Sequence, residues 1–412
     1  MEQTLKNVPQ IGQKIIALLF LFFVIFISSA CGASSEVAPP ASAEPPTSTE
    51  IPTETPTPTL GPVALTASCV NEAGHIYCIG EGMPVVTGAP DLYGQQISFS
   101  PEFFCASDLD IRLCKAATEA FLLAAKEWGN YGPVEYWIMG TDEAAGDSMV
   151  DVFCNRRSER NDDDFNECIK HEGTFGDHGM NSYRELGAQW LEEKSAASNM
   201  GHNGGRQFNY HKYTSSVPWG FDNSYDLEGQ QSAAGEQKTV FHEYFHTIQH
   251  SALLTQDWYE RDEGMKPRWF TEGGAEFMAQ VATARLRSSD AFTSSEIAGQ
   301  GPFDFNQEMQ NALFAAKESF KSCGGDLSDT GYGAKCDSYG AAYAGGAWAH
   351  AYLSHTYGSD VLLEVFYPNR EAMGFEGAFM HTYGQTVEDF VTEFNEFLKL
   401  PLDQQMEILP QA

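Results

Sequence analysis

Apolar side chains recur at helical spacing in the stretch Thr239 to His250, TVFHEYFHTIQH. They stand one, three and four positions apart, which is the spacing of residues on one face of an α-helix. These apolar residues are Val240, Phe241, Tyr244, Phe245 and Ile248. The pattern predicts an amphipathic helix that buries an aromatic stripe and leaves its polar residues on the remaining surface.

The same kind of pattern divides the rest of the chain into two parts. Before residue 236 it is mixed: it predicts a helix over 110–128 and strands over 134–139 and 206–213. The glycine-rich, charged stretch 144–200 has no clear periodicity. After residue 236, helical spacing dominates, over residues 271–286, 306–322, 341–357 and 387–398. We therefore expect an α+β fold, with an N-terminal mixed-sheet subdomain (67–235) and a mostly helical C-terminal subdomain (236–412).

Three polar residues of the first stretch have the order HExxH: His242, Glu243 and His246. Two histidines four residues apart lie one turn above each other, close enough for both imidazoles to bind one zinc ion. Glu243 lies about 100° around the helix, where it can act as general base on a water activated by the metal. The alternative is two helix histidines beside a solvated glutamate.

A catalytic zinc needs a third protein ligand and an open position. The next apolar cluster, Trp269 to Phe277, has the sequence WFTEGGAEF and supplies Glu272 as the candidate. We expect Thr271 to cap a helix there. Glu276 is one turn further on the same face, where it can accept the free ring N–H of a ligand histidine. Alternatively, both glutamates are favourable charges in the first turn of a helix.

HEYFH followed by WFTEGGAEF resembles the gluzincin metallopeptidases, in which the two motif histidines and a downstream glutamate hold zinc. The stretch YAGGAWAHAYL from Tyr343 is similar to the gluzincin aminopeptidase helix whose tyrosine stabilises the oxyanion; where that family has a lysine, this chain has Gly345. The resemblance implies a zincin-like fold with an active-site cleft between the two subdomains. It also implies one zinc per chain on His242, His246 and Glu272.

The resemblance further implies a peptidase acting on peptides or proteins, with Glu243 and Tyr343 as catalytic residues. An edge strand, within 206–213, would pair with the substrate backbone. The glycine-rich motif that captures a free substrate amine is not apparent, which favours an endopeptidase. Two alternatives remain: a surface binding or adhesion lipoprotein with a structural zinc, and a zinc amidase acting on cell-wall or glycan substrates.

Two other histidines have competing interpretations. His250 stands four residues after His246, but the longer metzincin motif would need its third histidine where Ala252 stands. We therefore expect His250 to be a polar residue at the helix end. His350 shares a helical face with Tyr343, so it either faces the cleft and helps to hold the oxyanion or packs between helices.

The N-terminus has the features of an export signal. Lys6 and Lys14 precede an apolar run over 15–27, which is too short to span a membrane but suits a signal peptide (1–30). The sequence Ser-Ser-Ala-Cys31 resembles a bacterial lipoprotein processing site, with Cys31 as the lipidated residue. The Pro/Thr-rich segment 31–66 is predicted to be a disordered linker. We expect an extracytoplasmic protein, lipid-anchored at the bacterial cell surface; a short membrane helix is the alternative.

Cysteine usage agrees with export. Beyond Cys31, eight of the nine cysteines form four close pairs, which suggest disulfide bonds in an oxidising location. Pairing of neighbours is the simplest of about 105 connectivities. The candidate pairs are Cys69 with Cys78, Cys105 with Cys114, Cys154 with Cys168, and Cys323 with Cys336.

The formal net charge of −33 changes the expected partners. So acidic a chain argues against binding to nucleic acid and against adsorption to anionic lipid, so membrane contact is expected through the lipid anchor only. We expect a monomer. The acidic run Asp162-Asp163-Asp164 with Asn166 and Glu167 suggests either a calcium site built from oxygen ligands or a solvated charge run.

Overall fold

The computed structural model describes residues 66–88, 92–173, 179–193, 200–204, 210–221, 233–255, 258–289 and 303–411. All of them belong to one compact unit, Pro58–Ala412. The predicted signal peptide, the lipidation of Cys31 and nearly all of the linker lie outside the described residues. Among the helices of the described residues, none has the length and apolar character needed to cross a membrane.

The strands form one mixed sheet of six strands in the order β1-β2-β3-β4-β6-β5. The pairs β3–β4 and β4–β6 are parallel, whereas β1–β2, β2–β3 and β5–β6 are antiparallel. The expected α+β class is therefore confirmed. The strands are β1 Ala67–Glu72, β2 His75–Gly80, β3 Glu102–Ala106, β4 Val134–Ile138, β5 Met200–Gly204 and β6 Tyr210–Ser215.

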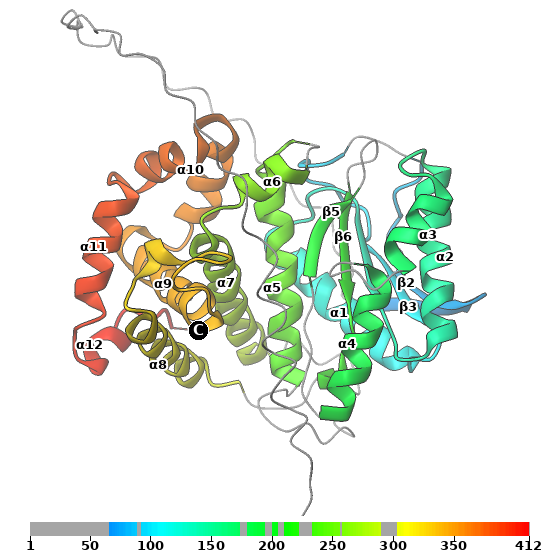
Figure 1. Ribbon diagram of the computed structural model, residues 1–412, viewed down its shortest axis with the longest axis horizontal. Coiled ribbons are helices and arrows are strands. Elements are labelled where there is room, and N and C mark those ends of the chain that lie inside the picture. The colour runs from blue at the N-terminus through cyan, green and yellow to red at the C-terminus, as the bar shows by residue number, and fades with distance from the viewer. Residues whose placement is uncertain are drawn as a thin grey trace, which may run out of the picture. The chain divides into compact units, whose positions relative to one another are not determined.

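Helices cover both faces of this sheet (Figure 1). Neighbouring residues of β4 point to opposite faces, as the pleat of a strand requires. Tyr136 meets Phe121 of α1 (Ile111–Trp128) on one face, and Trp137 meets Phe153 of α2 (Glu143–Glu159) on the other. Burial on both faces explains why every residue of β3 and β4 is buried, including Glu102 and Glu135, which pair with Arg156.

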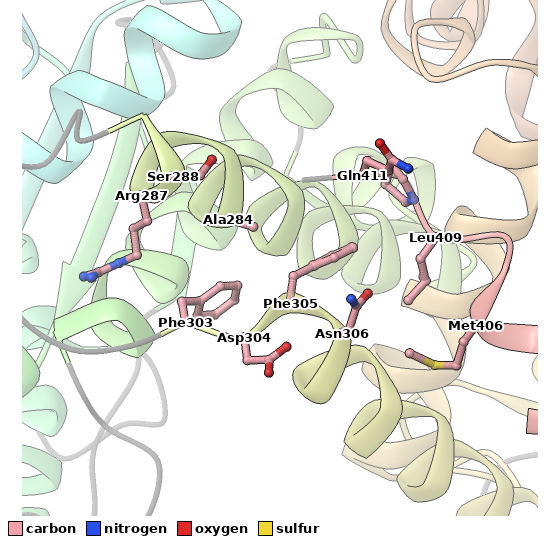
Figure 2. Close-up of a pocket in the computed structure, with 11 residues that line it drawn as sticks. Ala284, Arg287, Ser288, Phe303, Asp304, Phe305, Asn306, Met406, Leu409 and Gln411 are labelled. Atoms are coloured by element: carbon pink, nitrogen blue, oxygen red, sulfur yellow. The ribbon is translucent and has the colours of Figure 1, made fainter. Parts of the chain in front are cut away.

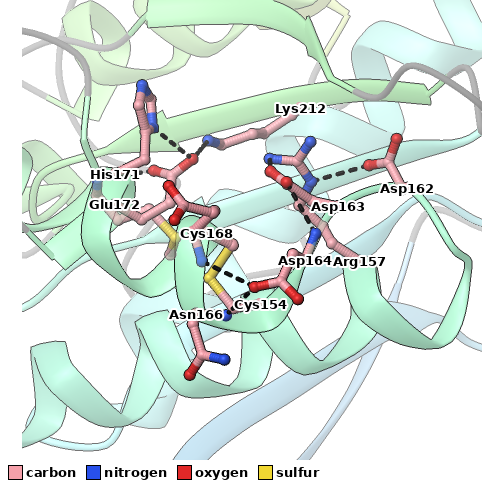
Figure 3. The surroundings of a disulfide bond; sticks show 12 residues. Cys154, Arg157, Asp162, Asp163, Asp164, Asn166, Cys168, His171, Glu172 and Lys212 are labelled. Carbon is pink, nitrogen blue, oxygen red and sulfur yellow. Dashed lines mark hydrogen bonds and ion pairs between the residues drawn. A yellow bond between two sulfur atoms is a disulfide. The ribbon is translucent and has the colours of Figure 1, made fainter.

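The stretch that had no periodicity, 144–200, contains three helices in its described part. These are α2, α3 (Phe165–Gly173) and α4 (Met180–Glu193). Asp142 caps the start of α2, because its side chain accepts the backbone N–H of Ala145. The Cys154–Cys168 disulfide bond joins α2 to α3 (Figure 3).

From Ala233 on, the described residues form helices joined by turns. In Figure 1, α5 stands between the sheet with its helices and the remaining helices of the chain. α7 packs against both α5 and α9, and a Cβ atom at Gly273 of α7 would collide with the backbone of Gly346 in α9. The helices are α5 Ala233–Ser251, α6 Trp258–Gly264, α7 Arg268–Ser288, α8 Phe305–Cys323, α9 Gly345–Tyr357, α10 Tyr367–Tyr383, α11 Val387–Phe397 and α12 Leu402–Met406.

Two sequence predictions about these elements need correction. α7 begins at Arg268 after Pro267, so Thr271 lies inside the first turn, where its hydroxyl donates to the carbonyl of Met265 instead of capping the helix. The strand predicted over 206–213 is β6, and it lies inside the sheet between β4 and β5. The strand at that edge of the sheet is β5.

Three of the four predicted disulfide bonds are present: Cys69–Cys78, Cys154–Cys168 and Cys323–Cys336. The prediction for Cys105 and Cys114 is wrong for this structure, in which both are free thiols. Both are fully buried between β3 and α1, where they fill the core as small apolar side chains. Burial, together with a hydrogen bond to Cys114, raises the pKa of the Cys105 thiol well above its usual value.

Candidate metal centre

The aromatic stripe of α5 fixes which face of this helix is left for the polar residues. Tyr244 packs edge-on against Phe121 of α1, with ring centroids 4.7 Å apart, and Phe245 packs edge-on against Trp128 at 5.2 Å. The Tyr244 hydroxyl donates to the carbonyl of Gly129 just beyond α1. With this stripe buried against α1, the two motif histidines turn toward α7.

His242, His246 and Glu272 come together there. Glu272 Oε2 lies 3.4 Å from His242 Nε2 and 3.5 Å from His246 Nε2, and all three donor atoms lie within 4.8 Å of one another. Zinc bonds of about 2.0–2.2 Å in tetrahedral arrangement place donor atoms roughly 3.3 Å apart, so both histidine–glutamate distances suit one ion. Glu272 Oε2 is also buried, and it accepts no hydrogen bond from a described residue. This group could hold a metal ion and is compatible with zinc.

A carboxylate orients the first histidine. The Nδ1 atom of His242 donates to Glu276 Oε2 at 3.2 Å, which leaves Nε2 facing Glu272. Glu276 is held in turn by Lys238, whose Nζ lies 2.8 Å from Oε1 and 3.0 Å from Oε2, and by Gln280 at 3.0 Å. Glu276 thus makes the contact that its helical spacing predicted.

A glutamine orients the second histidine, and the sequence analysis missed it. The Nδ1 atom of His246 donates to Gln249 Oε1 at 2.6 Å. The amide nitrogen of Gln249 donates to the carbonyl of Thr271 at 2.8 Å and to the hydroxyl of Tyr367 at 3.1 Å. The available signal was position: Gln249 stands three residues after His246, which puts both on one helical face.

The charges of this group favour a cation. Burial alone would lower the pKa of His242, but its interactions with Glu272 and Glu276 outweigh burial and raise that pKa to about 10. Burial would raise the pKa of Glu272, yet the two imidazoles beside it bring that pKa well below its usual value. Both glutamates therefore stay ionised at neutral pH, and Lys238 is the cation paired with one of them.

Tyr343 lies beside the metal ligands. Its ring stacks on that of His242, with centroids 5.6 Å apart and planes 13° from parallel. It belongs to a π-helical segment, Gly340–Ala344, immediately before α9; such segments often occur at functional sites. Burial first, then the charges of Glu272 and Glu243, raise the pKa of Tyr343. The phenol therefore remains protonated and can donate a hydrogen bond.

Glu243 does not belong to the group of three candidate ligands. Its charge contributes to the raised pKa of Tyr343 on one side and, after burial, to that of Tyr213 on β6. The side chain is buried. Its charge thus lies near both Tyr343 and the sheet.

His350 and His250 do not belong to the group of candidate metal ligands. His350 is buried between α9 and α7, where its Nε2 atom lies 2.8 Å from the carbonyl oxygen of Phe270, so it is a packing residue. Burial lowers its pKa to about 4, which keeps the ring neutral. His250 is buried in the last turn of α5, and its backbone carbonyl accepts from Tyr93.

The carboxylates of the acidic run form ion pairs and hydrogen bonds with neighbouring residues (Figure 3). Asp162 and Asp163 pair with Arg157 at 2.8 and 3.1 Å, and Asp164 accepts the backbone N–H groups of Asn166 and Glu167 at the start of α3. Among the described residues, the group of His242, His246 and Glu272 is the one that brings three such ligand atoms together. These contacts favour a charge run held by the fold over a calcium site.

A pocket of about 920 Å³ opens elsewhere (Figure 2). It lies between the end of α7, the start of α8 and the C-terminal residues beyond α12, and none of the metal ligands lines it. Its cationic residue, Arg287, donates to Gln237. Nothing among its lining residues resembles a pair of acid and base groups, so the candidate chemistry lies at the metal group.

Comparison with models of protein families, with curated proteins and with solved structures finds no match.

Proposed function

We propose that this protein is a zinc-dependent peptidase of gluzincin type with a zincin-like fold. One observation carries the proposal: the Nε2 atoms of His242 and His246 lie 3.4 and 3.5 Å from Glu272 Oε2, and Glu243 follows His242 directly on the same helix. Two imidazoles, one carboxylate and a separate buried carboxylate are the components of a zinc hydrolase site. The resemblance of the HEYFH and WFTEGGAEF motifs supports the same assignment.

The residues have distinct roles in this proposal. His242, His246 and Glu272 would hold one zinc ion, which when bound would polarise the attacking water and the scissile carbonyl. Glu243 accepts the proton of that water and delivers it to the leaving amine. Tyr343 donates a hydrogen bond to the developing oxyanion, a contribution of about 2.7–4 kcal/mol for one such donor in other enzymes. Glu276 and Gln249 fix the orientation of the two histidine rings.

The substrate backbone would approach along β5. This strand ends the sheet beside β6, and it packs next to α5, which carries the metal ligands. A peptide that pairs with a sheet edge is aligned by main-chain hydrogen bonds without regard to its sequence. Such alignment suits cleavage within a chain, so we assign an endopeptidase rather than an exopeptidase.

We also propose export to the cell surface, with Cys31 as the lipid-bearing residue. The three disulfide bonds support an oxidising compartment, because such bonds persist mainly outside the cytoplasm. Membrane association would then depend on the lipid anchor.

The test compares the protein with its Glu243→Gln variant, which keeps the shape of the side chain but cannot accept the proton. Zinc content is measured by mass spectrometry, and hydrolysis of casein is followed in parallel. We expect about one zinc per chain in both proteins and a loss of about 10²–10⁴-fold in activity in the variant. Equal activity in both would remove Glu243 from the mechanism. If the protein binds zinc and releases products from peptidoglycan but does not hydrolyse casein, the proposed function becomes that of an amidase.

A further inference from the structure

Two tyrosines stand out on the surface of the described residues. Tyr332 is 80% exposed and Tyr339 is 59% exposed, which makes them the most exposed large hydrophobic side chains among those residues. Both lie in the segment between α8 and Tyr343, residues 324–339, which we call the stapled loop. A single exposed tyrosine is ordinary. Here two exposed tyrosines lie in one short loop beside the candidate catalytic residue Tyr343.

Covalent and hydrogen bonds fix the stapled loop. The Cys323–Cys336 disulfide bond joins its second half to the end of α8. The backbone N–H of Gly333 donates to Asp337 at 2.8 Å, and that of Cys336 donates to the carbonyl of Asp329 at 3.1 Å. The two rings are thus presented by a braced backbone, which lowers the entropy lost when a ligand packs on them.

Stacked rings connect this loop to the metal ligands. The ring of Tyr339 lies 4.8 Å from that of Tyr343, with planes 22° from parallel. Tyr343 in turn stacks on His242 at 5.6 Å. The rings therefore form a continuous layer from a metal ligand out to solvent.

Arg268 completes this surface. It stands one turn before Glu272 on α7, and its guanidinium carbon lies 4.1 Å from the ring centroid of Tyr332 and 5.5 Å from that of Tyr343. Its charge is offset by Asp337, whose Oδ1 atom lies 2.6 Å from Nη1. The guanidinium thus spans the space between the exposed ring and the ring at the metal group.

We propose that Tyr332, Tyr339 and Arg268 form a recognition surface for an aromatic side chain of the substrate, close to the bond that is cleaved. This inference rests on the proposed peptidase function. A cationic side chain is disfavoured because Arg268 already covers Tyr332, and an anionic one because Asp337 already pairs with Arg268. A neutral ring packs offset or edge-on against exposed tyrosines, with a preference of about 2- to 13-fold for each ring pair.

The test uses a library of internally quenched peptides in which phenylalanine or alanine occupies each position around the cleaved bond. The readout is the ratio of kcat/KM for the phenylalanine peptide to that for its alanine partner. We expect a ratio above one at one or two positions, and a decrease of about 2- to 13-fold in that ratio in Tyr332→Ala and in Tyr339→Ala. The control is Phe314→Ala, which removes a 48% exposed ring from α8, outside this surface. Circular dichroism confirms that each variant is folded.

An unchanged ratio in both tyrosine variants would overturn the surface while the peptidase function stands. If no peptide is cleaved, the proposed function fails, and the surface is tested by fluorescence anisotropy with the same labelled peptides. Binding of the phenylalanine peptide that weakens in Tyr332→Ala but not in Phe314→Ala would support the surface without catalysis. Equal binding by all the proteins, or no binding, would overturn it.

Discussion

Two clusters of buried charge lie on different parts of this molecule, and they differ in balance. Around the Cys154–Cys168 disulfide bond, Lys212 Nζ lies 2.8 Å from Glu172, both almost fully buried, and Arg157 lies 2.8 Å from Asp162 (Figure 3). Glu172 and Asp162 are thus each paired with a fixed cation. At the metal group, by contrast, Lys238 pairs with Glu276, whereas Glu272 faces His242, whose raised pKa keeps a proton on its ring.

This difference indicates what each cluster is for. Buried charge is stable when each group is paired and hydrogen-bonded, and a cluster that meets this condition needs nothing further from solution. A cluster that is balanced by a proton on an imidazole can exchange that proton for a metal ion, and here the donor atoms have the spacing that an ion needs. The first cluster is thus expected to support the fold, and the second to bind an ion.

The largest effect is expected from Glu272→Gln, which removes one charge at nearly constant shape. Zinc affinity should fall by more than about 100-fold, because loss of outer partners alone costs 10–100-fold. A chelator should lower the melting temperature of the parent protein but not that of this variant, since an ion bound to the folded state stabilises it. The control, Glu172→Gln, alters the balanced cluster and should keep its zinc. Full zinc binding by Glu272→Gln would contradict the assignment.

The second prediction breaks the balanced cluster. Lys212→Met leaves Glu172 buried without its cation and should lower the free energy of unfolding by about 3–5 kcal/mol, measured by denaturant titration. The double variant Lys212→Met/Glu172→Gln should recover most of this loss, because no uncompensated charge remains. Zinc content should be unchanged in both. A loss below about 1 kcal/mol in the single variant would show that water or another group compensates Glu172.

The metal ligands could be predicted from the sequence because they depend on local spacing. His242, His246 and Glu243 share one helix, and Glu272 and Glu276 share another, so the period of the α-helix alone places each set on its face. The small residue after Glu272, Gly273, instead lets α7 approach α9, where a Cβ atom would collide with the backbone of Gly346.

Other features depend on contacts between distant segments, and the sequence does not reveal them. Tyr332 meets Arg268 across a stretch that includes two helices, and no local period records that contact. Cys105 and Cys114 are close in sequence like the three bonded pairs, yet they remain free thiols in the core. β6 was predicted within two residues of its true end, but its interior position depends on its pairing with β4 and β5.

The third prediction concerns a buried carboxyl that forms no ion pair with a described residue and does not belong to the metal group. Burial raises the pKa of Glu236 to about 8, and a hydrogen bond from the backbone of Gly220 offsets this only in part. Because the folded-state pKa exceeds the usual 4.5, the folded protein binds the proton more tightly. The stabilisation that protonated Glu236 contributes is therefore fully present below about pH 4.5 and is lost as the pH rises to about 8.

Glu236→Gln should remove this pH dependence. Between pH 5 and pH 9 the variant should gain about 4 kcal/mol relative to the parent, somewhat less than the roughly 5 kcal/mol that the full pKa difference allows. Denaturant unfolding at both pH values measures the difference. A parallel pH dependence in parent and variant would show that Glu236 ionises normally.

The smallest effect is expected from Gln249→Ala, which leaves all three ligands in place. His246 would lose the acceptor that fixes its ring, so zinc affinity should fall by about 10–100-fold in a competition titration with a chelating dye. The matched control is Gln280→Ala, which removes a hydrogen bond to Glu276 rather than one to a ligand, and it should change the affinity less. If the two variants behave alike, ring orientation contributes little, and the charge of Glu272 carries the affinity. If only Gln249→Ala weakens binding, the hydrogen bonds that hold the histidines are part of the site, and charge balance alone does not define it.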